Sequence, residues 1–160
     1  MDNNILASEY GIQQLDELSR TDYLVDLNQG MDARLVNERT ADIIARLKWI
    51  KYIRFSCDQI PQIDAIMKAA ALLEARGVKQ YRLFTYMLVT KDIENAAYRI
   101  ERLKALKNMS IYAQAERNGL KGIKPNAAQL VFAGRYVYGR CYKKESWPDY
   151  CRRKNLRYLD

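Results

Sequence analysis

The chain has 160 residues, a formal charge of +8 and 49% hydrophobic residues, which is the composition of one globular domain with a core. It contains no histidine, which excludes Ser–His and Cys–His catalysis and every zinc site that uses imidazole. The odd number and wide spacing of its cysteines, Cys57, Cys141 and Cys151, argue against a disulfide framework. No run of about 18 apolar residues and no basic, apolar leader is present, so we expect no membrane helix and a cytoplasmic location.

In chain order, amphipathic helices alternate with short apolar strands. Helical periodicity and capping residues predict four helices, at Ser8–Arg20, Glu38–Lys48, between Pro61 and Gly77, and at Asp92–Lys107. Apolar runs predict strands at Tyr23–Leu27, Ile50–Cys57, Tyr81–Val89 and Met109–Ala115. This alternation favours an α/β fold with a parallel sheet and right-handed crossovers that place the helices on its outside.

After Gly119 the alternation stops. Asn126–Tyr142 and Ser146–Tyr158 are basic, aromatic and predicted to be helical. We therefore divide the chain into an α/β part, residues 1–119, and a basic helical tail, residues 120–160, that packs on it. The tail has eight basic residues against two acidic ones between Arg135 and Arg157, and it contains interleaved aromatic residues: Tyr136, Tyr138, Tyr142, Trp147, Tyr150 and Tyr158.

Polar residues occupy one face of two predicted strands. In Ile50–Cys57, Tyr52, Arg54 and Ser56 alternate with apolar residues, and Asp58 continues their row; Asp26 and Asn28 form a similar row at the end of the preceding strand. Ligands of parallel α/β sheets bind at the carboxyl ends of the strands, where these residues lie. Because a buried charge is costly unless it is paired, the rows indicate either a ligand site or an internal ion pair of Arg54 with Asp26 or Asp58.

These rows belong to segments that resemble one protein family. Residues 25–35 read VDLNQGMDARL and are similar to the DFNQGLDARL stretch of radical S-adenosylmethionine (SAM) proteins. Residues 53–58 resemble the RFAFD strand that follows it, residues 2–8 resemble the DNNFLAS end of an earlier strand, and residues 86–89 match the next strand. The resemblance covers about residues 2–115. It implies a six-strand partial (βα) barrel, of which this chain would supply the C-terminal half as a parallel half-barrel with a basic tail.

The resemblance also implies cofactors and their contacts. Radical SAM proteins bind a 4Fe–4S cluster through a CxxxCxxC loop, and cleavage of SAM at the cluster yields a 5′-deoxyadenosyl radical. Eight residues match positions that face SAM or substrate: Asn28, Gln29, Arg34, Arg54, Ser56, Asp58, Tyr86 and Val89. The alternatives are an ordinary turn at Asn28–Gly30, a solvated Arg34 and a core position for Tyr86. No catalytic residue or metal ligand is assigned.

The sequence departs from this family because it has no CxxxCxxC motif. We therefore expect a fragment or split part of a radical SAM enzyme that does not hold the cluster and is not active alone; an inactive truncated remnant is an alternative. An open strand edge near Tyr23–Leu27 favours a homodimer or a second chain that carries the missing half-barrel. A further alternative is a non-catalytic module in which the basic, aromatic tail binds RNA or another polyanion, or else the tail is a solvated helix whose aromatics cover the barrel. The sequence does not indicate the substrate.

Overall fold

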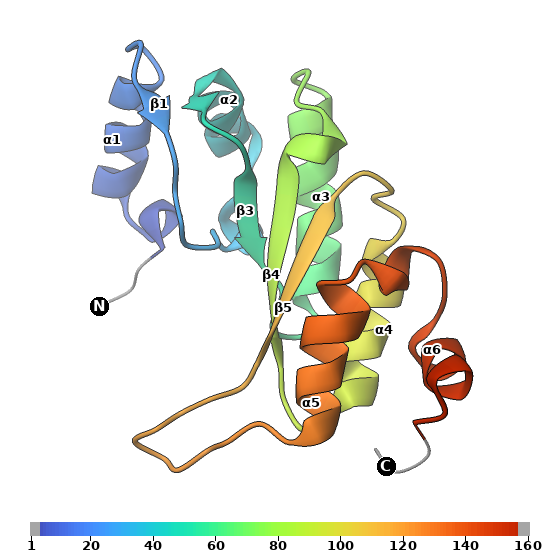
Figure 1. The fold of residues 1–160 in the computed structure, drawn as a ribbon. Coiled ribbons are helices and arrows are strands. Elements are labelled where there is room, and N and C mark those ends of the chain that lie inside the picture. The colour runs from blue at the N-terminus through green and yellow to red at the C-terminus, as the bar shows by residue number, and fades with distance from the viewer. Residues whose placement is uncertain (1–3, 157–160) are drawn as a thin grey trace.

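Parallel strands flanked by helices make up most of the chain in a computed structural model that describes residues 4–156 (Figure 1). The helices are α1 (Glu9–Leu18), α2 (Glu38–Arg46), α3 (Gln62–Glu74), α4 (Ile93–Leu103), α5 (Ala127–Val131) and α6 (Trp147–Lys154). The strands are β1 (Leu24–Val25), β2 (Lys48–Trp49), β3 (Ile53–Ser56), β4 (Leu83–Val89) and β5 (Ser110–Ala115). Single 3-10 turns lie at Ile5–Ala7, Ala33–Leu35, Gln80–Arg82 and Cys141–Lys143.

All the strands run parallel, in two small sheets. β1 pairs with β2, and β3, β4 and β5 form a second sheet in that order. The segment after β1 continues beside β3, because Met31 donates its N–H to the Arg54 carbonyl (2.8 Å) and accepts the N–H of Ser56 (3.2 Å). Within residues 4–156 neither outer edge pairs with a further strand, so the fold is an open α/β arrangement with its strands in chain order.

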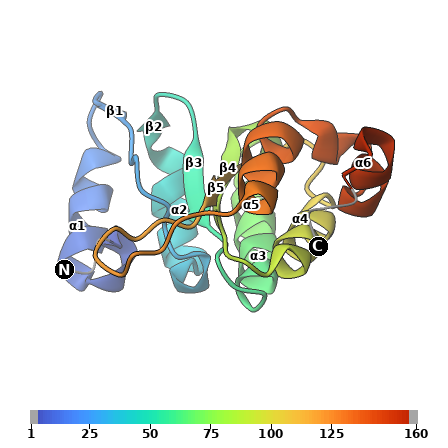
Figure 2. The same cartoon turned by 60° about the horizontal axis from the view of Figure 1, so that its bottom comes forward.

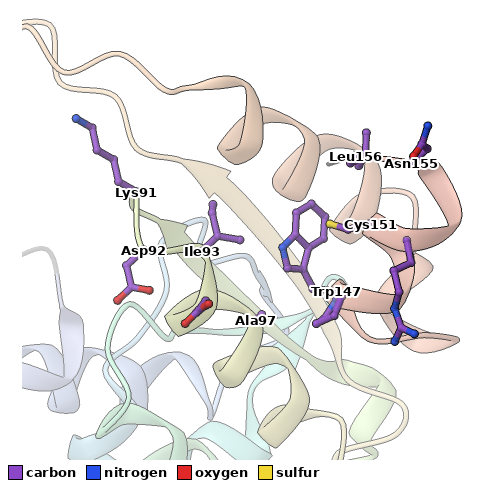
Figure 3. A pocket seen from close by; sticks show the side chains of 11 residues that line it. Lys91, Asp92, Ile93, Ala97, Trp147, Cys151, Asn155 and Leu156 are labelled. Atoms are coloured by element: carbon purple, nitrogen blue, oxygen red, sulfur yellow. The ribbon is translucent and has the colours of Figure 1, made fainter. Parts of the chain in front are cut away.

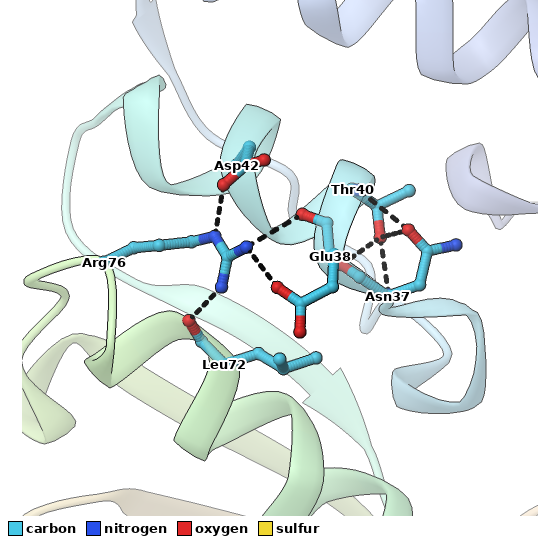
Figure 4. Close-up of polar contacts among 6 residues, drawn as sticks. All are labelled: Asn37, Glu38, Thr40, Asp42, Leu72 and Arg76. Atoms are coloured by element: carbon cyan, nitrogen blue, oxygen red, sulfur yellow. Dashed lines mark hydrogen bonds and ion pairs between the residues drawn. The ribbon is translucent and has the colours of Figure 1, made fainter.

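The helices begin where the sequence places side-chain caps. Ser8 accepts the N–H of Gly11 (3.0 Å) before α1, and Asn37 and Thr40 form a reciprocal capping box before α2 (Figure 4). Asp92 accepts the N–H of Asn95 (2.9 Å) before α4. These predicted starts are confirmed, because a cap satisfies main-chain donors locally and needs no tertiary partner.

Arg76 joins α2 to the end of α3. Its guanidinium contacts the carboxylates of Glu38 (2.5 Å) and Asp42, and donates to the Leu72 carbonyl of its own helix (2.8 Å; Figure 4). Figures 1 and 2 show α1, α2, α3 and α4 following one another along the same side of the strands. The contacts of Arg76 with Glu38 and Asp42 therefore join two neighbouring helices of one continuous layer.

Burial alternates along each strand of the second sheet. In β4 the side chains of Leu83, Thr85, Met87 and Val89 are buried, while the residues between them are partly exposed. The pattern in β3 and β5 has the same period. Since successive strand residues point to opposite faces, one face packs under the helices and the other remains open. The predicted division of residues 52–58 into a buried apolar face and an opposite polar face is confirmed.

The predicted strand Ile50–Cys57 is longer than the observed strand, so that prediction was wrong in extent. Only Ile53–Ser56 (β3) pairs with β4, and a bend at residues 50–52 separates it from β2, which lies before the predicted strand and pairs with β1. At this bend the Arg82 guanidinium, and not a neighbouring strand, donates to the carbonyls of Trp49 and Lys51 (3.3 Å each). The chain before β4 is a 3-10 turn and offers no strand ladder there, so the side chain satisfies these acceptors.

The predicted helix Asn126–Tyr142 is also shorter than expected. After α5 it continues as a π-helical turn over Phe132–Val137, in which Tyr138 donates its N–H to the Ala133 carbonyl five residues back (3.0 Å). It then breaks at Gly139, where an added Cβ would lie 2.3 Å from the Arg135 carbonyl oxygen. Arg140 follows in the left-handed conformation (φ 58°). A bend of this kind depends on close main-chain packing that helical periodicity does not reveal.

Aromatic side chains pack the tail together. The rings of Phe132, Tyr136, Trp147 and Tyr150 form one cluster with centroid separations from 4.9 to 5.6 Å. Most of the predicted tail aromatics are therefore core residues, whereas Tyr138 is exposed. Arg157 and Tyr158 lie outside the described residues. None of the helices in residues 4–156 is long and apolar enough to cross a bilayer.

Candidate functional site

The open face of the sheet carries polar and aromatic side chains at neighbouring positions. The register aligns Ser56 with Tyr86 and Tyr112, and Leu88 with Gln114. All five are at least partly exposed in the described structure. Parallel sheets are usually covered on both faces and built from apolar residues. An uncovered parallel face with this composition is thus the feature of the fold that most resembles a ligand surface.

Aromatic rings form a continuous row across this face. Tyr52 lies 5.1 Å from Phe84, Phe84 lies 5.1 Å from Tyr86, and Tyr86 lies 6.0 Å from Tyr112, measured between ring centroids. The contacts are tilted or edge-on, which are favourable geometries for aromatic pairs. Rings held in this way present flat apolar surface to a heteroaromatic ligand without collapsing onto one another.

Arg54 pairs with Asp26 on the same face. Its guanidinium contacts the Asp26 carboxylate and also donates to the Leu27 carbonyl (3.1 Å). Only 11% of the Arg54 side chain is exposed, so water reaches little of its guanidinium. The Asp26 carboxylate and the Leu27 carbonyl supply hydrogen-bond partners in its place. Of the two ion-pair partners expected from the sequence, the structure selects Asp26, because the segment carrying it lies directly beside β3.

Asp58 instead takes part in a break of the sheet ladder. In a regular parallel ladder the Leu88 N–H would donate to the Cys57 carbonyl, because Cys57 already donates to Tyr86 (2.8 Å). Here the Leu88 N–H donates to the Asp58 carboxylate (2.7 Å), and the Cys57 carbonyl accepts from the Arg99 guanidinium. Two side chains thus replace one main-chain bond at the carboxyl ends of β3 and β4.

Arg99 is the main functional candidate that the sequence analysis missed. It is 1% exposed and reaches from α4 to the Cys57 carbonyl, the Leu88 carbonyl (2.9 Å) and the Asn95 side chain (2.8 Å). Burial lowers the pKa of Arg99 from its ordinary value, and the nearby carboxylate of Asp58 opposes this shift. Its position three residues after Ala96, on the apolar side of the helix, was the one indication in the sequence that Arg99 would be buried.

Cys57 is enclosed beneath the same break. Its thiol is buried, and burial raises the pKa of Cys57 to about 11. The thiol is therefore protonated at neutral pH and is not a metal ligand in this conformation. Cys141 and Cys151 lie in the tail and are half-buried. In the part of the chain that the structure describes, no three His, Cys, Asp or Glu side chains are grouped so that they could hold a metal ion.

The predicted site residues divide into those the structure brings together and those it does not. Arg54, Ser56 and Tyr86 lie on the open face, with Asp58 at its carboxyl end. Arg34 is separate: it is exposed and pairs with Asp32, with its Nε 2.9 Å from the nearer carboxylate oxygen.

Val89 faces the helices and not the open side. Its side chain is buried, and its carbonyl accepts hydrogen bonds from the Glu116 N–H (2.9 Å) and the Gln129 amide (2.8 Å). Neither the Val89 side chain nor its carbonyl is thus positioned to meet a ligand on the open face. The even-numbered residues of β4 face the open side instead, because successive side chains of a strand point to opposite faces.

Asn28 and Gln29 are exposed on a loop pressed against β3. They line a cavity of about 240 Å³. Between this loop and the strand lies Gly30, where an added Cβ would lie 2.8 Å from the Phe55 carbonyl carbon and 2.9 Å from the Ser56 nitrogen. Glycine is required here by the close approach of the two main chains. The loop therefore holds its amide side chains beside the Asp26–Arg54 pair, whose carboxylate residue also lines the cavity.

A larger cavity of about 1050 Å³ lies elsewhere, between the start of α4 and α6 (Figure 3). Trp147 and Arg152 line it from α6, Ile93 and Ala97 line it from α4, and Asp92 lines it from the position just before α4. None of the eight predicted site residues borders this cavity. Its size alone does not connect it to the polar rows of the sheet.

Comparison with models of known protein families, with curated proteins and with solved structures found no match for this chain.

Proposed function

We propose that this chain forms the C-terminal wall of a radical SAM enzyme barrel and that its open sheet face lines the chamber for SAM and substrate. The observation that supports this most is the open face itself: parallel strands in chain order have helices on one side and polar and aromatic residues on the other. A barrel fragment has this arrangement, since a barrel keeps its helices outside and its ligand groups inside. The similarity of residues 25–35 and 53–58 to radical SAM proteins adds to it.

In this proposal, the open face and the loop beside β3 bind different parts of SAM. The rings of Tyr86 and Tyr112 offer a stacking surface for adenine, and the amides of Asn28 and Gln29 offer hydrogen bonds to ribose or to the methionine moiety. Arg54 is held by Asp26, so its position is set before a ligand arrives. The chain then acts by binding and orienting the ligand and by excluding water from one side of it.

The iron–sulfur cluster does not fit the residues of this chain. A cluster needs several thiolates close together, whereas Cys57 is enclosed and protonated and the other cysteines lie in the tail. We therefore assign no step of cluster chemistry to this chain. The proposal places the cluster ligands on a partner, either a second copy or a second chain, that adds strands at the unpaired edge of β1, where Tyr23 and Leu24 are exposed.

Amide NMR with added SAM tests the ligand face. The full chain, labelled with nitrogen-15, is titrated with SAM, and we expect shift changes to cluster at 26–29, 54–58 and 86–88. Tyr86→Ala should reduce these changes, because it removes the central ring of the row. Tyr81→Ala is the matched control, since Tyr81 precedes the same strand and is 60% exposed.

Two results would contradict the proposal. One is the absence of any shift change up to millimolar SAM. The other is a set of changes that lies away from the open face, for example along the cavity between α4 and α6, and that Tyr86→Ala leaves intact.

A further inference from the structure

A second groove lies at the free edge of the sheet, between β5 and α5. It has a volume of about 440 Å³, within the range of small-ligand sites. Tyr112 and Gln114 line it from the strand, and Tyr138 lines it from the end of the π-helical turn. Tyr112 is 38% exposed and Tyr138 is 73% exposed, so both rings are accessible along this groove.

Small residues keep this groove open. Ala133 and Gly134 form its helical side, and an added Cβ at Gly134 would meet no atom within 4 Å. The groove therefore has room beside the rings of Tyr112 and Tyr138 for a flat group. The Gln114 side chain offers an amide donor and acceptor at the same place.

The segment that forms the groove carries uncompensated positive charge. Residues 110–144 contain seven basic residues against the single acid Glu116, and all seven are exposed: Arg117, Lys121, Lys124, Arg135, Arg140, Lys143 and Lys144. None of the seven forms an ion pair with another residue of the described range 4–156. By contrast, seven of the nine basic residues between positions 4 and 76 are ion-paired.

The positive charge continues from the groove into a long loop. Arg117 lines the groove, and Lys121 and Lys124 follow on residues 116–126, which extend away from β5 before returning to α5 (Figures 1 and 2). An Asn118–Ile123 bridge shapes this loop, with N–H to carbonyl distances of 3.0 and 2.9 Å. Arg117 thus connects the groove with the cations of this loop, which extends toward the side of the molecule where α1 lies (Figures 1 and 2).

We propose that the groove and the adjoining loop bind single-stranded RNA, with bases stacked on Tyr112 and Tyr138 and phosphates along Arg117, Lys121 and Lys124. Single-strand sites combine rings that stack on exposed bases with cations that follow the backbone. A duplex keeps its bases stacked inside and does not offer them to the two rings. The site is separate from the ligand face proposed above, except that Tyr112 and Gln114 border both. It also differs from the predicted tail site, most of whose aromatics are buried.

Fluorescence anisotropy tests this site on the full chain. With a labelled uridine oligomer of about 12 nucleotides, we expect binding at low salt that weakens as salt rises, because counterions are released from the strand. Tyr138→Ala should raise Kd by roughly 5- to 150-fold, the effect of losing one stacked base, while Tyr138→Phe should keep wild-type affinity. Gly134→Leu should fill the groove and weaken binding as well.

Matched variants separate stacking from simple charge attraction. Tyr10→Ala, an exposed tyrosine on α1, should leave Kd unchanged, and Lys68→Gln on α3 should change it less than Lys121→Gln. Each lysine lost from the track should lower the salt slope by about 0.7. Far-ultraviolet circular dichroism confirms that each variant is folded.

Three outcomes would overturn the proposal. No binding at about 50 mM salt would exclude a site of this charge. Equal affinity for an RNA duplex or for heparin would exclude recognition of a single strand. Unchanged affinity in both folded Tyr138→Ala and folded Gly134→Leu would show that the groove takes no part, so that only diffuse charge attraction remains.

Discussion

Replacing Arg99 by methionine tests the most unusual polar contact of the fold. Methionine has a similar length and fills the space beneath β3 and β4, but it cannot donate a hydrogen bond. The change removes the donors of the Cys57 and Leu88 carbonyls at the point where the ladder is broken. Asn95 also loses its partner, but it is half-buried and water can replace that contact.

The expected loss of stability follows from these acceptors. A buried carbonyl without a partner costs roughly 1–3 kcal/mol, so two of them cost about 2–6 kcal/mol. Burial of the guanidinium has a desolvation cost, which also lowers the pKa of Arg99. Removing the guanidinium removes this cost and so offsets part of the loss in stability. We expect a net loss of about 3 kcal/mol in the free energy of unfolding, with an intermediate loss for Arg99→Lys, which keeps the charge but not the planar fork.

Urea unfolding followed by tryptophan fluorescence measures this loss. With ordinary urea dependence the midpoint should fall by roughly 1–3 M. The loss should be the same at about pH 6 and pH 9, because an arginine stays protonated throughout this range even when burial lowers its pKa. Arg102→Met, an exposed arginine on the same helix, should change stability by no more than about 0.5 kcal/mol. A loss below about 1 kcal/mol for Arg99→Met would refute the assignment of Arg99 as the replacement for the missing ladder bond.

Three further changes test other parts of the fold. Gly30→Ala should destabilise the protein by about 1–3 kcal/mol in the same urea assay because its Cβ would strike the main chain of β3, whereas Gly119→Ala, with no atom within 4 Å, should have little effect. Iodoacetamide at pH 8 should label Cys141 in the folded protein but spare Cys57, since burial raises the Cys57 pKa to about 11; mass spectrometry that finds Cys57 labelled first would contradict its enclosure. Light scattering should show an assembly larger than one chain, and Leu24→Lys at the exposed β1 edge should shift it toward the monomer; a wild-type monomer would count against a partner at this edge.

Local patterns were sufficient for the starts of α1, α2 and α4 and for the faces of the strands, but not for the extent of the predicted helix Asn126–Tyr142. Ser8, Asn37 and Asp92 mark helix starts that depend only on neighbouring main-chain groups, so the sequence indicates them directly. Alternation in residues 52–58 identified the polar face for the same reason, since strand side chains alternate whatever their neighbours are. The fold class of parallel α/β followed from these elements.

Contacts between distant segments were decided by the tertiary structure. The sequence offered Asp26 and Asp58 as partners of Arg54, and only the placement of the β1 segment beside β3 selected Asp26. The break between β3 and β4 and its replacement by Arg99 depend on how α4 packs, because a guanidinium can reach several carbonyls and its sequence position does not say which.

The groove at the sheet edge shows the same division. Basic and aromatic residues in the last third of the chain were evident from composition, but the sequence did not distinguish the rings that pack the core from those that face solvent. Folding buries Tyr136 and Tyr150 and leaves Tyr138 exposed at the same groove as Tyr112, which comes from a different element. Charge and periodicity are properties of a segment and can be read along the chain. Burial and proximity depend on which segments pack together, and only the folded structure determines them.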